Sequence, residues 1–286
     1  MSILGNSNYV LANLGQTLPH NYVNPANPTT HINPRMVNMT WLNVTSGEIF
    51  TCMDNTPNAN VWFGLNDTYI SPIRRIDLLL EILHPNIVSL DDSSGNNNDA
   101  LSMGATRSDG VSYFDSIAFD GAVATKPITG DIGFTTSSSW SLSTWVYQTE
   151  RSTSGQADIL SIGDSGGAWC ALNIKDDGTI GGGFDDDVSP VWPFSSQVVP
   201  LNTWTHLGVT YNRITDLAQM YSNGVPITTS NSDISGVGSG TATVGYTIGW
   251  RYNKDLDHFV GRICMPRAYH CALTSVEMLK LYEEGS

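Results

Sequence analysis

The stretch "TWTHLGVTYNRITDLAQMYSNGVPI", residues 203–227, decides the fold class of this chain. Apolar and polar residues alternate through 204–212 and again through 217–222, which is the period of a β-strand with one buried face. Asn223-Gly224 then supplies the two residues that a type I′ hairpin turn favours. The segment therefore predicts antiparallel strands joined by short turns, and such strands recur from about residue 87 almost to the C-terminus.

The same alternation marks further segments that are separated by turns rich in Gly, Asp, Asn and Ser. They are "SIAFDG", "WSLSTWVYQ", "ADILSIG", "AWCALNIK", "TIGGGF", "TVGYTIGW" and "FVGRICMPRAY". Only the final "TSVEMLKLYEEGS" is typical of a helix, with Thr274 or Ser275 as its N-cap. This distribution predicts a mainly β protein, an antiparallel sandwich without βαβ units. We expect the aromatic residues Phe119, Trp145, Trp204 and Tyr221 to fill the space between its sheets.

The charge balance argues against nucleic-acid binding. The 286 residues include 27 acidic and 13 basic side chains, for a net charge of −14. Such a surface repels phosphate backbones, and no Lys/Arg cluster offsets the repulsion. The N-terminus has no basic residue before its short apolar stretch, so we expect no secretory signal, and no apolar run is long enough to predict membrane insertion.

The four cysteines, Cys52, Cys170, Cys264 and Cys271, show no C-x-x-C spacing. Without an oxidising address we expect reduced and mostly buried thiols. A Cys264–Cys271 disulfide remains the alternative, because the first lies in a predicted strand and the second just beyond it.

The N-terminal third divides into three predicted segments. Residues 1–38 carry scattered Pro among Asn, Thr and His, which predicts an extended arm that is ordered on a partner, or else a loose tail. Residues 39–68 alternate, turn at Ser46-Gly47 and alternate again, which predicts a β-hairpin. Because a hairpin is too short to bury both Trp41 and Trp62, we expect these two side chains to contact sister chains.

Residues 69–86 change to a helical period. Ser71 caps the predicted helix, Pro72 starts it and Pro85 ends it. Its apolar positions follow a heptad-like spacing: Tyr69, Ile73, Ile76, Leu80 and Leu83. Two interpretations stay open, a helix that packs on its own β-domain, or a helix at a three-fold axis where copies of the chain bury one another's stripes.

Several blocks of residues 87–286 occur in a fixed order: "LDDSSGNNNDALSMGAT", "SIAFDG", "WSLSTWVYQ", "NTWTHLGVTYN", "QMYSNGVPI", "TIGWR" and the closing strand and helix from residue 259. In that order they resemble the laminin-G-like, concanavalin A-like jelly-roll domains. The resemblance implies a jelly-roll sandwich over residues 87–286 and a lectin-type binding module.

The same resemblance raises a structural Ca²⁺ site. Many members of that family hold Ca²⁺ with loop carboxylates, and calcium prefers six to eight oxygen ligands. The candidates here lie in the Asx-rich segment: Asp91, Asp92, Asn98 and Asp99. The family's usual acidic partner in the closing strand is replaced by Cys264-Met265, so an ordinary Asx-rich turn is the competing interpretation.

An enzyme is not expected. A glycanase needs two carboxylates flanking the scissile bond, and no Glu has an acidic partner two or four positions away in a predicted strand. His206 lies within a strand, where a structural histidine is more common than a catalytic one.

Aromatic residues in loops are the candidate ligand contacts, because their faces can stack on sugar rings or apolar partners. We predict ligand binding by residues near the "FDDDVSPVWPF" loop and near residue 250: Trp192, Trp169, Trp250, Tyr252, Asp185 and Asp187. Trp192, between two prolines, is the residue most expected to be exposed.

The segment "VNMTWLNVTSGEIFTCMDNTPNANVWFG", residues 37–64, resembles a module of phage tail-fibre and other virion proteins. The resemblance implies a virion protein that is assembled in the host cytoplasm and is a trimer, the usual state of such fibres. Residues 1–64 would attach it to other virion proteins, and the head would bind host-surface glycans. The alternatives are a capsid or tail decoration protein and a cellular carbohydrate-binding module.

Overall fold

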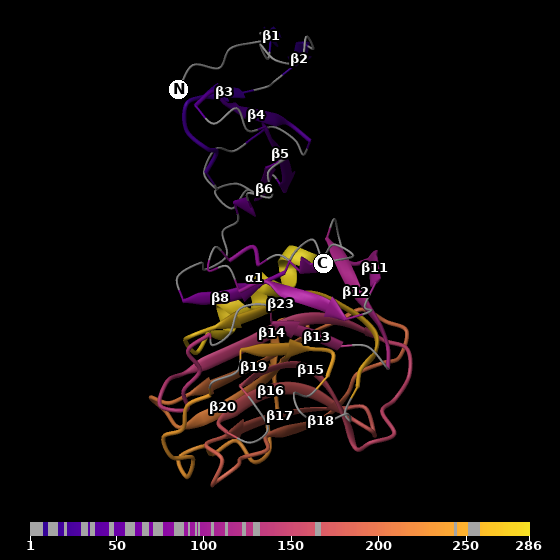
Figure 1. Ribbon diagram of the computed structural model, residues 1–286, viewed down its shortest axis with the longest axis vertical. Helices are drawn as coiled ribbons and strands as arrows, with labels where there is room; N and C mark the ends of the chain where they lie inside the picture. The colour runs from indigo at the N-terminus through magenta and orange to yellow at the C-terminus, as the bar shows by residue number, and fades with distance from the viewer. Residues whose placement is uncertain are drawn as a thin grey trace. The chain divides into compact units, whose positions relative to one another are not determined.

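The computed structural model describes residues 8–10, 17–19, 22–29, 34, 38–45, 49–54, 61–64, 69–70, 77–82, 89–90, 92–94, 96, 98–103, 106–111, 114–121, 124–127, 132–163, 167–242, 245–250 and 258–286. The chain divides into two compact units, residues 1–73 and residues 74–286 (Figure 1). Each unit is considered by itself. No helix in the described ranges has the length and hydropathy that a membrane span requires.

The N-terminal unit holds a five-stranded sheet in the order β3-β4-β5-β6-β7 and a separate β1-β2 pair. The strands are β1 Asn8–Val10, β2 Thr17–Pro19, β3 Tyr22–Asn24, β4 Thr40–Asn43, β5 Ile49–Asp54, β6 Val61–Gly64 and β7 Tyr69–Ile70. β4 and β5 pair antiparallel, which confirms the predicted hairpin, while β3 joins β4 in parallel. Residues 22–24, which were predicted to lie in an extended arm, therefore belong to the sheet.

The hairpin's tryptophans are buried within this one chain. Trp41 is 2% and Trp62 0% exposed, and they form a small core with Phe50 and Cys52. Tyr22 packs on both indole rings, and the Trp41 Nε1 atom donates to the Ala26 carbonyl at 2.8 Å. The expectation that both indoles contact sister chains is thus wrong, because β3 and the residues after it supply the missing cover. The oligomeric state itself stays a prediction.

The C-terminal unit is an antiparallel sandwich, as predicted. Its larger sheet has eight strands in the order β11-β12-β23-β14-β19-β20-β21, with β8 paired to β23. These strands are β8 Leu78–Glu81, β11 Thr106–Asp109, β12 Asp115–Asp120, β14 Trp140–Gln148, β19 Thr205–Asn212, β20 Leu217–Ser222, β21 Val225–Ile227 and β23 Val260–Tyr269. The two central residues of the β20–β21 turn, Asn223 and Gly224, have φ of 49° and 74°, which confirms the type I′ turn.

The opposing sheet has five strands in the order β18-β17-β16-β15-β22, and a three-stranded sheet has the order β13-β10-β9. Their strands are β9 Ser89–Leu90, β10 Ala100–Met103, β13 Ala124–Pro127, β15 Gln156–Gly163, β16 Trp169–Lys175, β17 Thr179–Asp185, β18 Phe194–Val198 and β22 Tyr246–Ile248. Alternate residues of the two large sheets meet in one apolar core, with Leu142, Val209 and Leu172 among its fully buried members.

The predicted helix over residues 69–86 is wrong where the structure describes it. Residues 78–81 form strand β8, which pairs antiparallel with β23. Leu80 is fully buried in the sandwich core of its own chain rather than in a seam between chains. The leucine-rich run satisfies a helical and a strand period equally well, and pairing with residues 267–269 of β23, beyond the part that pairs with β12, decides between them. Ile73, Ile76 and Leu83 lie outside the described residues.

Three of the four aromatic residues expected between the sheets lie elsewhere. Phe119 belongs to the core, but Trp145 stacks on Tyr282 of the C-terminal helix. Trp204 is half-buried beside the Arg262 guanidinium, and Tyr221 lines a surface pocket described below. The strand period was predicted correctly, but the side of the sheet on which Trp145, Trp204 and Tyr221 lie was not.

The C-terminal helix is confirmed as α1, Ser275–Gly285, with Thr274 as N-cap. A capping box closes its first turn, because Glu277 accepts from the Thr274 backbone N–H while the Thr274 hydroxyl accepts from Glu277 N. All four cysteines are free thiols in the structure, and three of them, Cys52, Cys170 and Cys264, are buried as predicted.

Candidate functional site

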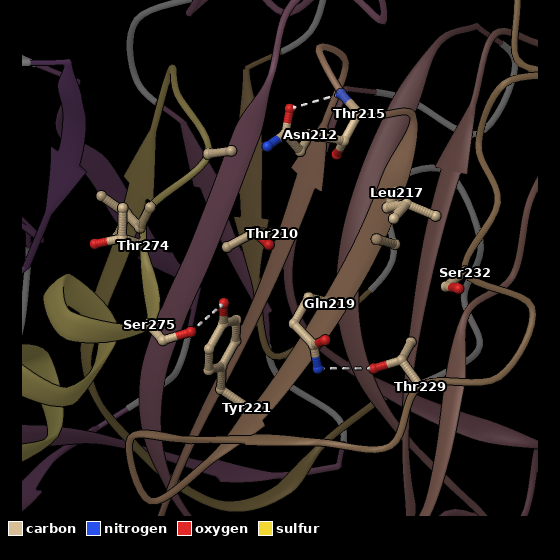
Figure 2. Close-up of a pocket in the computed structure, with 13 residues that line it drawn as sticks. Thr210, Asn212, Thr215, Leu217, Gln219, Tyr221, Thr229, Ser232, Thr274 and Ser275 are labelled. Carbon is tan, nitrogen blue, oxygen red and sulfur yellow. Dashed lines mark hydrogen bonds between the residues drawn. The ribbon is translucent and has the colours of Figure 1, made fainter.

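A polar pocket of about 320 Å³ lies on the outer face of the eight-stranded sheet. Its floor is formed by β19, β20 and the segment after β21, and the segment that leads into α1 forms a wall (Figure 2). The lining residues are Thr210, Asn212, Thr215, Leu217, Ala218, Gln219, Tyr221, Thr229, Ser232, Ala272, Leu273, Thr274 and Ser275. A volume of this size suits a single sugar ring or a comparable small molecule.

The strand period places these side chains on the outer face. Leu207, Val209 and Tyr211 of β19 point into the core, so Thr210 and Asn212 point away from it. On β20 the same alternation buries Met220 in the core and turns Gln219 outward beside its register partner Thr210.

Helix α1 and the segment before it cover only part of that outer face. A Cβ atom on Gly208 would lie 2.5 Å from the Met278 sulfur, so the glycine lets the helix approach the sheet closely. The Ser141 hydroxyl donates to the Cys271 carbonyl at 2.7 Å and accepts from Leu273 N at 2.8 Å. These bonds fix the pocket wall, and the part of the face beyond the helix stays open.

Gln219 is the central hydrogen-bonding group of the pocket. Its Nε2 atom donates to the Ile227 carbonyl at 2.7 Å and to the Met220 carbonyl at 2.8 Å. It also lies 3.2 Å from the Thr229 hydroxyl (Figure 2). These bonds orient the amide, and within the described residues its Oε1 atom accepts none of the protein's hydrogen bonds. Asn212 is arranged the opposite way, because its Oδ1 atom accepts from Ile214 N and Thr215 N, while its Nδ2 atom donates no hydrogen bond to the part of the chain that the structure describes. The pocket thus offers an oriented acceptor and an oriented donor.

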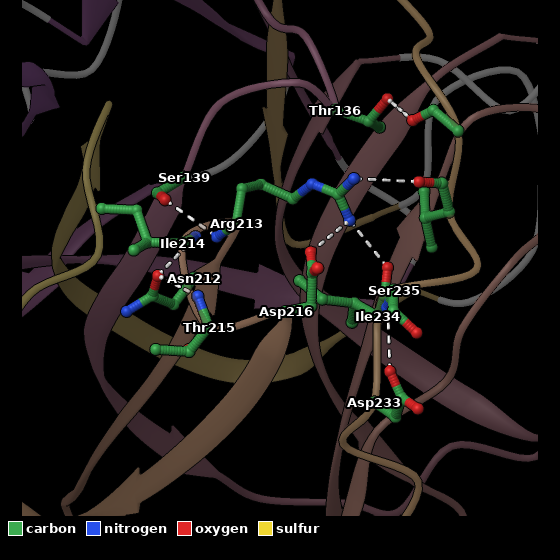
Figure 3. A network of polar contacts seen from close by, with 12 residues as sticks. Thr136, Ser139, Asn212, Arg213, Ile214, Thr215, Asp216, Asp233, Ile234 and Ser235 are labelled. Atoms are coloured by element: carbon green, nitrogen blue, oxygen red, sulfur yellow. Dashed lines mark hydrogen bonds and ion pairs between the residues drawn. The ribbon is translucent and has the colours of Figure 1, made fainter.

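An arginine network fixes the outer rim of the pocket (Figure 3). The Arg213 guanidinium donates to the carbonyls of Ile234 at 2.7 Å and Val237 at 3.1 Å. It also pairs with Asp216 at 3.1 Å across the turn between β19 and β20. Since Asn212 and Thr215 stand in this turn, Arg213 acts as a positioning residue for that side of the pocket.

The predicted ligand residues gather only in part, and on the other sheet. Trp169 and Trp192 pack with ring centroids 4.9 Å apart above Gly183. Trp169 is 4% exposed and donates from Nε1 to Asp185 at 3.0 Å, whereas Trp192 is half-buried. Of this pair, Trp192 is therefore the residue that is left partly exposed.

The remaining predicted ligand residues do not join that pair. Asp187 is exposed in a turn, where its backbone N–H donates to Asp185 at 2.8 Å. Trp250 is half-buried and stacks on His258 at 6.1 Å, and Tyr252 lies outside the described residues. None of the predicted ligand residues lines the polar pocket, which sequence reasoning missed.

The described candidates for the calcium site are engaged with the protein itself. Asp92 accepts from the backbone N–H groups of Glu81, Ser94 and Asn98 at 2.9 to 3.0 Å. Asp99 in turn accepts from Asp92 N at 2.8 Å. These bonds form an Asx-rich turn that holds the loop against β8, and Asp91 lies outside the described residues. In the described part of the chain no three His, Cys, Asp or Glu side chains cluster as metal ligands would.

A buried polar cluster lies beneath α1, separate from the pocket. His206 and Ser143 are hydrogen bonded at 2.8 Å, and burial, aided by the charge of Arg267, lowers the pKa of His206 to about 3. Arg267 bonds Glu81 of β8 at 2.6 Å and pairs with Glu284 of α1 at 2.5 Å, and burial raises the pKa of Glu284. These groups are covered by the helix, as expected for a structural histidine rather than a catalytic one.

The fold and site describe a lectin-type β-sandwich. Residues 118–278 match the concanavalin A-like lectin/glucanases superfamily, and this chain belongs to that superfamily. No curated protein sequence matches the chain.

Solved structures share the fold at low sequence identity. The binding domain of Paraclostridial Mosquitocidal Protein 1 is 18% identical with a TM-score of 0.60, over 73% of this chain and 52% of that one. The botulinum neurotoxin serotype D ligand binding domain, solved in complex with N-acetylneuraminic acid, is 16% identical with a TM-score of 0.56, over 73% and 51%. The sialidase of Trypanosoma rangeli is 13% identical with a TM-score of 0.56, over 85% and 43%. The chain spans about half or less of these structures, and the likeness concerns the fold alone.

Proposed function

We propose that this protein is a non-enzymatic adhesin whose sandwich unit, residues 74–286, binds a glycan in the polar pocket. The observation that carries the proposal is the pocket's lining of oriented, uncharged hydrogen-bonding side chains in a sandwich of the lectin superfamily. Each sugar hydroxyl both donates and accepts, so an uncommitted amide oxygen on Gln219 and an uncommitted amide nitrogen on Asn212 suit it.

The proposal is binding without catalysis. Glycoside hydrolysis requires two carboxyl groups that flank the scissile bond. The lining residues of the pocket, all within the described ranges, include none. A sugar held there meets groups that orient it but not the pair of carboxyl groups that this reaction uses.

More specifically, we propose that the protein is part of a virus particle. Its support is the resemblance of residues 37–64 to phage tail-fibre modules, which suits a short fibre or spike attached through residues 1–64 to other virion proteins. Display in several copies, with a trimer as the expected state, would multiply weak contacts into firm attachment.

The test is a glycan array probed with the full-length protein beside a Gln219→Leu variant. Leucine keeps the side-chain volume but removes the amide, so binding should fall at least about tenfold. The matched control is Gln197→Leu on β18, an exposed glutamine outside the pocket.

Light scattering on the full chain tests the trimer, and localisation on the parent particle by electron cryomicroscopy tests the virion role. A protein that binds no glycan but binds a capsid or tail protein tightly would overturn the adhesin in favour of a decoration protein.

A further inference from the structure

We infer that the polar pocket selects a neutral saccharide and discriminates against sugars that carry a carboxylate, such as sialic acids. The inference rests on the proposed function and narrows its ligand class. It is argued from the charges in and around the pocket.

The lining itself offers an anion no partner. None of the thirteen lining residues, all of which the structure describes, carries a formal charge. A carboxylate that enters such a pocket loses hydration without gaining a cation, whereas a neutral hydroxyl exchanges its water for amide and hydroxyl partners. The donor and acceptor on Asn212 and Gln219 serve the hydroxyl at no such cost.

Arg213, the basic residue nearest to the pocket in the sequence, makes its bonds to other parts of the protein. Arg213 follows the pocket residue Asn212, but its guanidinium donates to the Ile234 and Val237 carbonyls and pairs with Asp216. Figure 3 shows the side chain extended toward Ile234 and Asp216. Its charge is therefore offset where it stands.

Acidic residues are direct sequence neighbours of residues that line the pocket. Asp216 stands between the lining residues Thr215 and Leu217, and Asp233 follows the lining residue Ser232. A hydrogen bond from the Ser235 side chain and another from its backbone lower the pKa of Asp233, which keeps it ionised. Asp216 is offset by its pair with Arg213, so Asp233 is the carboxylate that repels an approaching anion, and the net charge of −14 acts in the same direction.

The N-terminus of α1 reaches the pocket through Thr274 and Ser275, and a helix N-terminus ordinarily favours an anion. Here the chain supplies its own anion. The Glu277 carboxylate accepts from Thr274 N at 2.8 Å and from the Thr274 hydroxyl at 2.8 Å. An external carboxylate would have to bind beside that charge, so the one feature that favours anions is already satisfied.

The experiment compares matched immobilised oligosaccharides, N-acetyllactosamine with and without a terminal sialic acid, using the full-length protein at low and high salt. We expect the neutral glycan to bind at least about tenfold more tightly, with a gap that narrows as salt screens the rim charges. Gln219→Leu should abolish the difference by weakening the neutral ligand. Glu277→Gln keeps the capping box but removes a charge, so it should improve only sialylated binding, by a few-fold.

The outcomes separate the inference from the proposed function. Equal or tighter sialylated binding that Gln219→Leu weakens would overturn the neutral selectivity while leaving the adhesin intact. Glycan binding that is indifferent to Gln219→Leu but normal in Gln197→Leu would overturn the pocket assignment. Binding of neither oligosaccharide, nor of any other glycan on an array, would overturn the proposed function itself.

Discussion

The Nε2 atom of His206 lies 2.8 Å from the Ser143 hydroxyl, while its Nδ1 atom is buried beneath α1 without a hydrogen-bond partner in the described structure. A second proton on the ring would therefore make the imidazole a buried cation beside Arg267, and burial, with the charge of Arg267, lowers the pKa of His206 from 6.5 to about 3.

This histidine predicts a pH dependence of stability. Because its pKa is lower folded than unfolded, the unfolded chain binds more protons between about pH 6.5 and 3, and the stability present above pH 6.5 is lost as the pH falls. At about 1.4 kcal/mol per pH unit, the free energy of unfolding should fall by about 2 kcal/mol from pH 6.5 to 5. Urea unfolding across that range should show a smaller loss in His206→Gln than in the wild type.

The exposed His270 provides the control, since His270→Gln should keep the wild-type dependence. Identical pH profiles for His206→Gln and the wild type would contradict the prediction.

Arg267 holds two buried carboxylates at once, Glu81 from the first strand of the sandwich and Glu284 from the last helix. Replacing it by methionine leaves both without their shared cation, which should cost about 3 to 5 kcal/mol of unfolding free energy. The triple variant Glu81→Gln/Arg267→Met/Glu284→Gln removes every charge and should regain much of that loss. Chemical denaturation measures both, and a single variant as stable as the wild type would refute the account.

Substitution of Asp92 is expected to lower the stability of the protein, and the same variant tests the calcium hypothesis. Its carboxylate accepts three backbone N–H groups, one of them from Glu81 on β8. Asp92→Ala should therefore lower the unfolding free energy by about 2 to 4 kcal/mol. Asp176→Ala, at an exposed turn aspartate, is the control and should have a small effect.

For the metal, thermal melting in EDTA and in Ca²⁺ is decisive. If the Asx-turn bonds are the whole role of Asp92, the two melting temperatures coincide. A melting temperature that EDTA lowers in the wild type and not in Asp92→Ala would favour a calcium site.

The strands of the sandwich could be predicted from the sequence because the alternation of apolar and polar residues is a local pattern. It failed over residues 78–81, where "LLLE" fits either period and the choice depends on pairing with β23, far along the chain. It also failed for Trp41, which is covered by Tyr22 and Ala26, two residues of the segment predicted to be an extended arm.

The polar pocket could not be predicted from the sequence, for a related reason. Gln219 and Thr210 become neighbours through the register of β19 and β20, and Ser275 reaches them only after α1 folds back onto the sheet. No spacing in the sequence brings these uncharged residues together. Two of the aromatic residues predicted to bind the ligand, Trp169 and Trp192, instead pack over Gly183 of β17.

Substitution of Arg213 tests whether the rim of the polar pocket must be rigid for glycan binding. Arg213→Ala removes the bonds to Ile234 and Val237, so the turn with Asn212 should loosen and glycan affinity should drop several-fold. The matched control is Arg151→Ala, which likewise removes a bond to a backbone carbonyl, that of Val199, but away from the pocket. If both variants bind as the wild type does, the network does not position the site.

Trp192 and Gln219 mark the two surfaces that compete for the ligand role, on opposite sheets of the sandwich. Trp192 is half-buried and lies outside the polar pocket, and the Asn231 Nδ2 atom donates to its carbonyl at 3.0 Å. We therefore expect Trp192→Ala to leave glycan affinity within about twofold of the wild type, while Gln219→Leu lowers it at least about tenfold. Surface plasmon resonance on one immobilised glycan measures both. The reverse ranking would move the binding site to the Trp169–Trp192 pair and restore the prediction made from the loop aromatics.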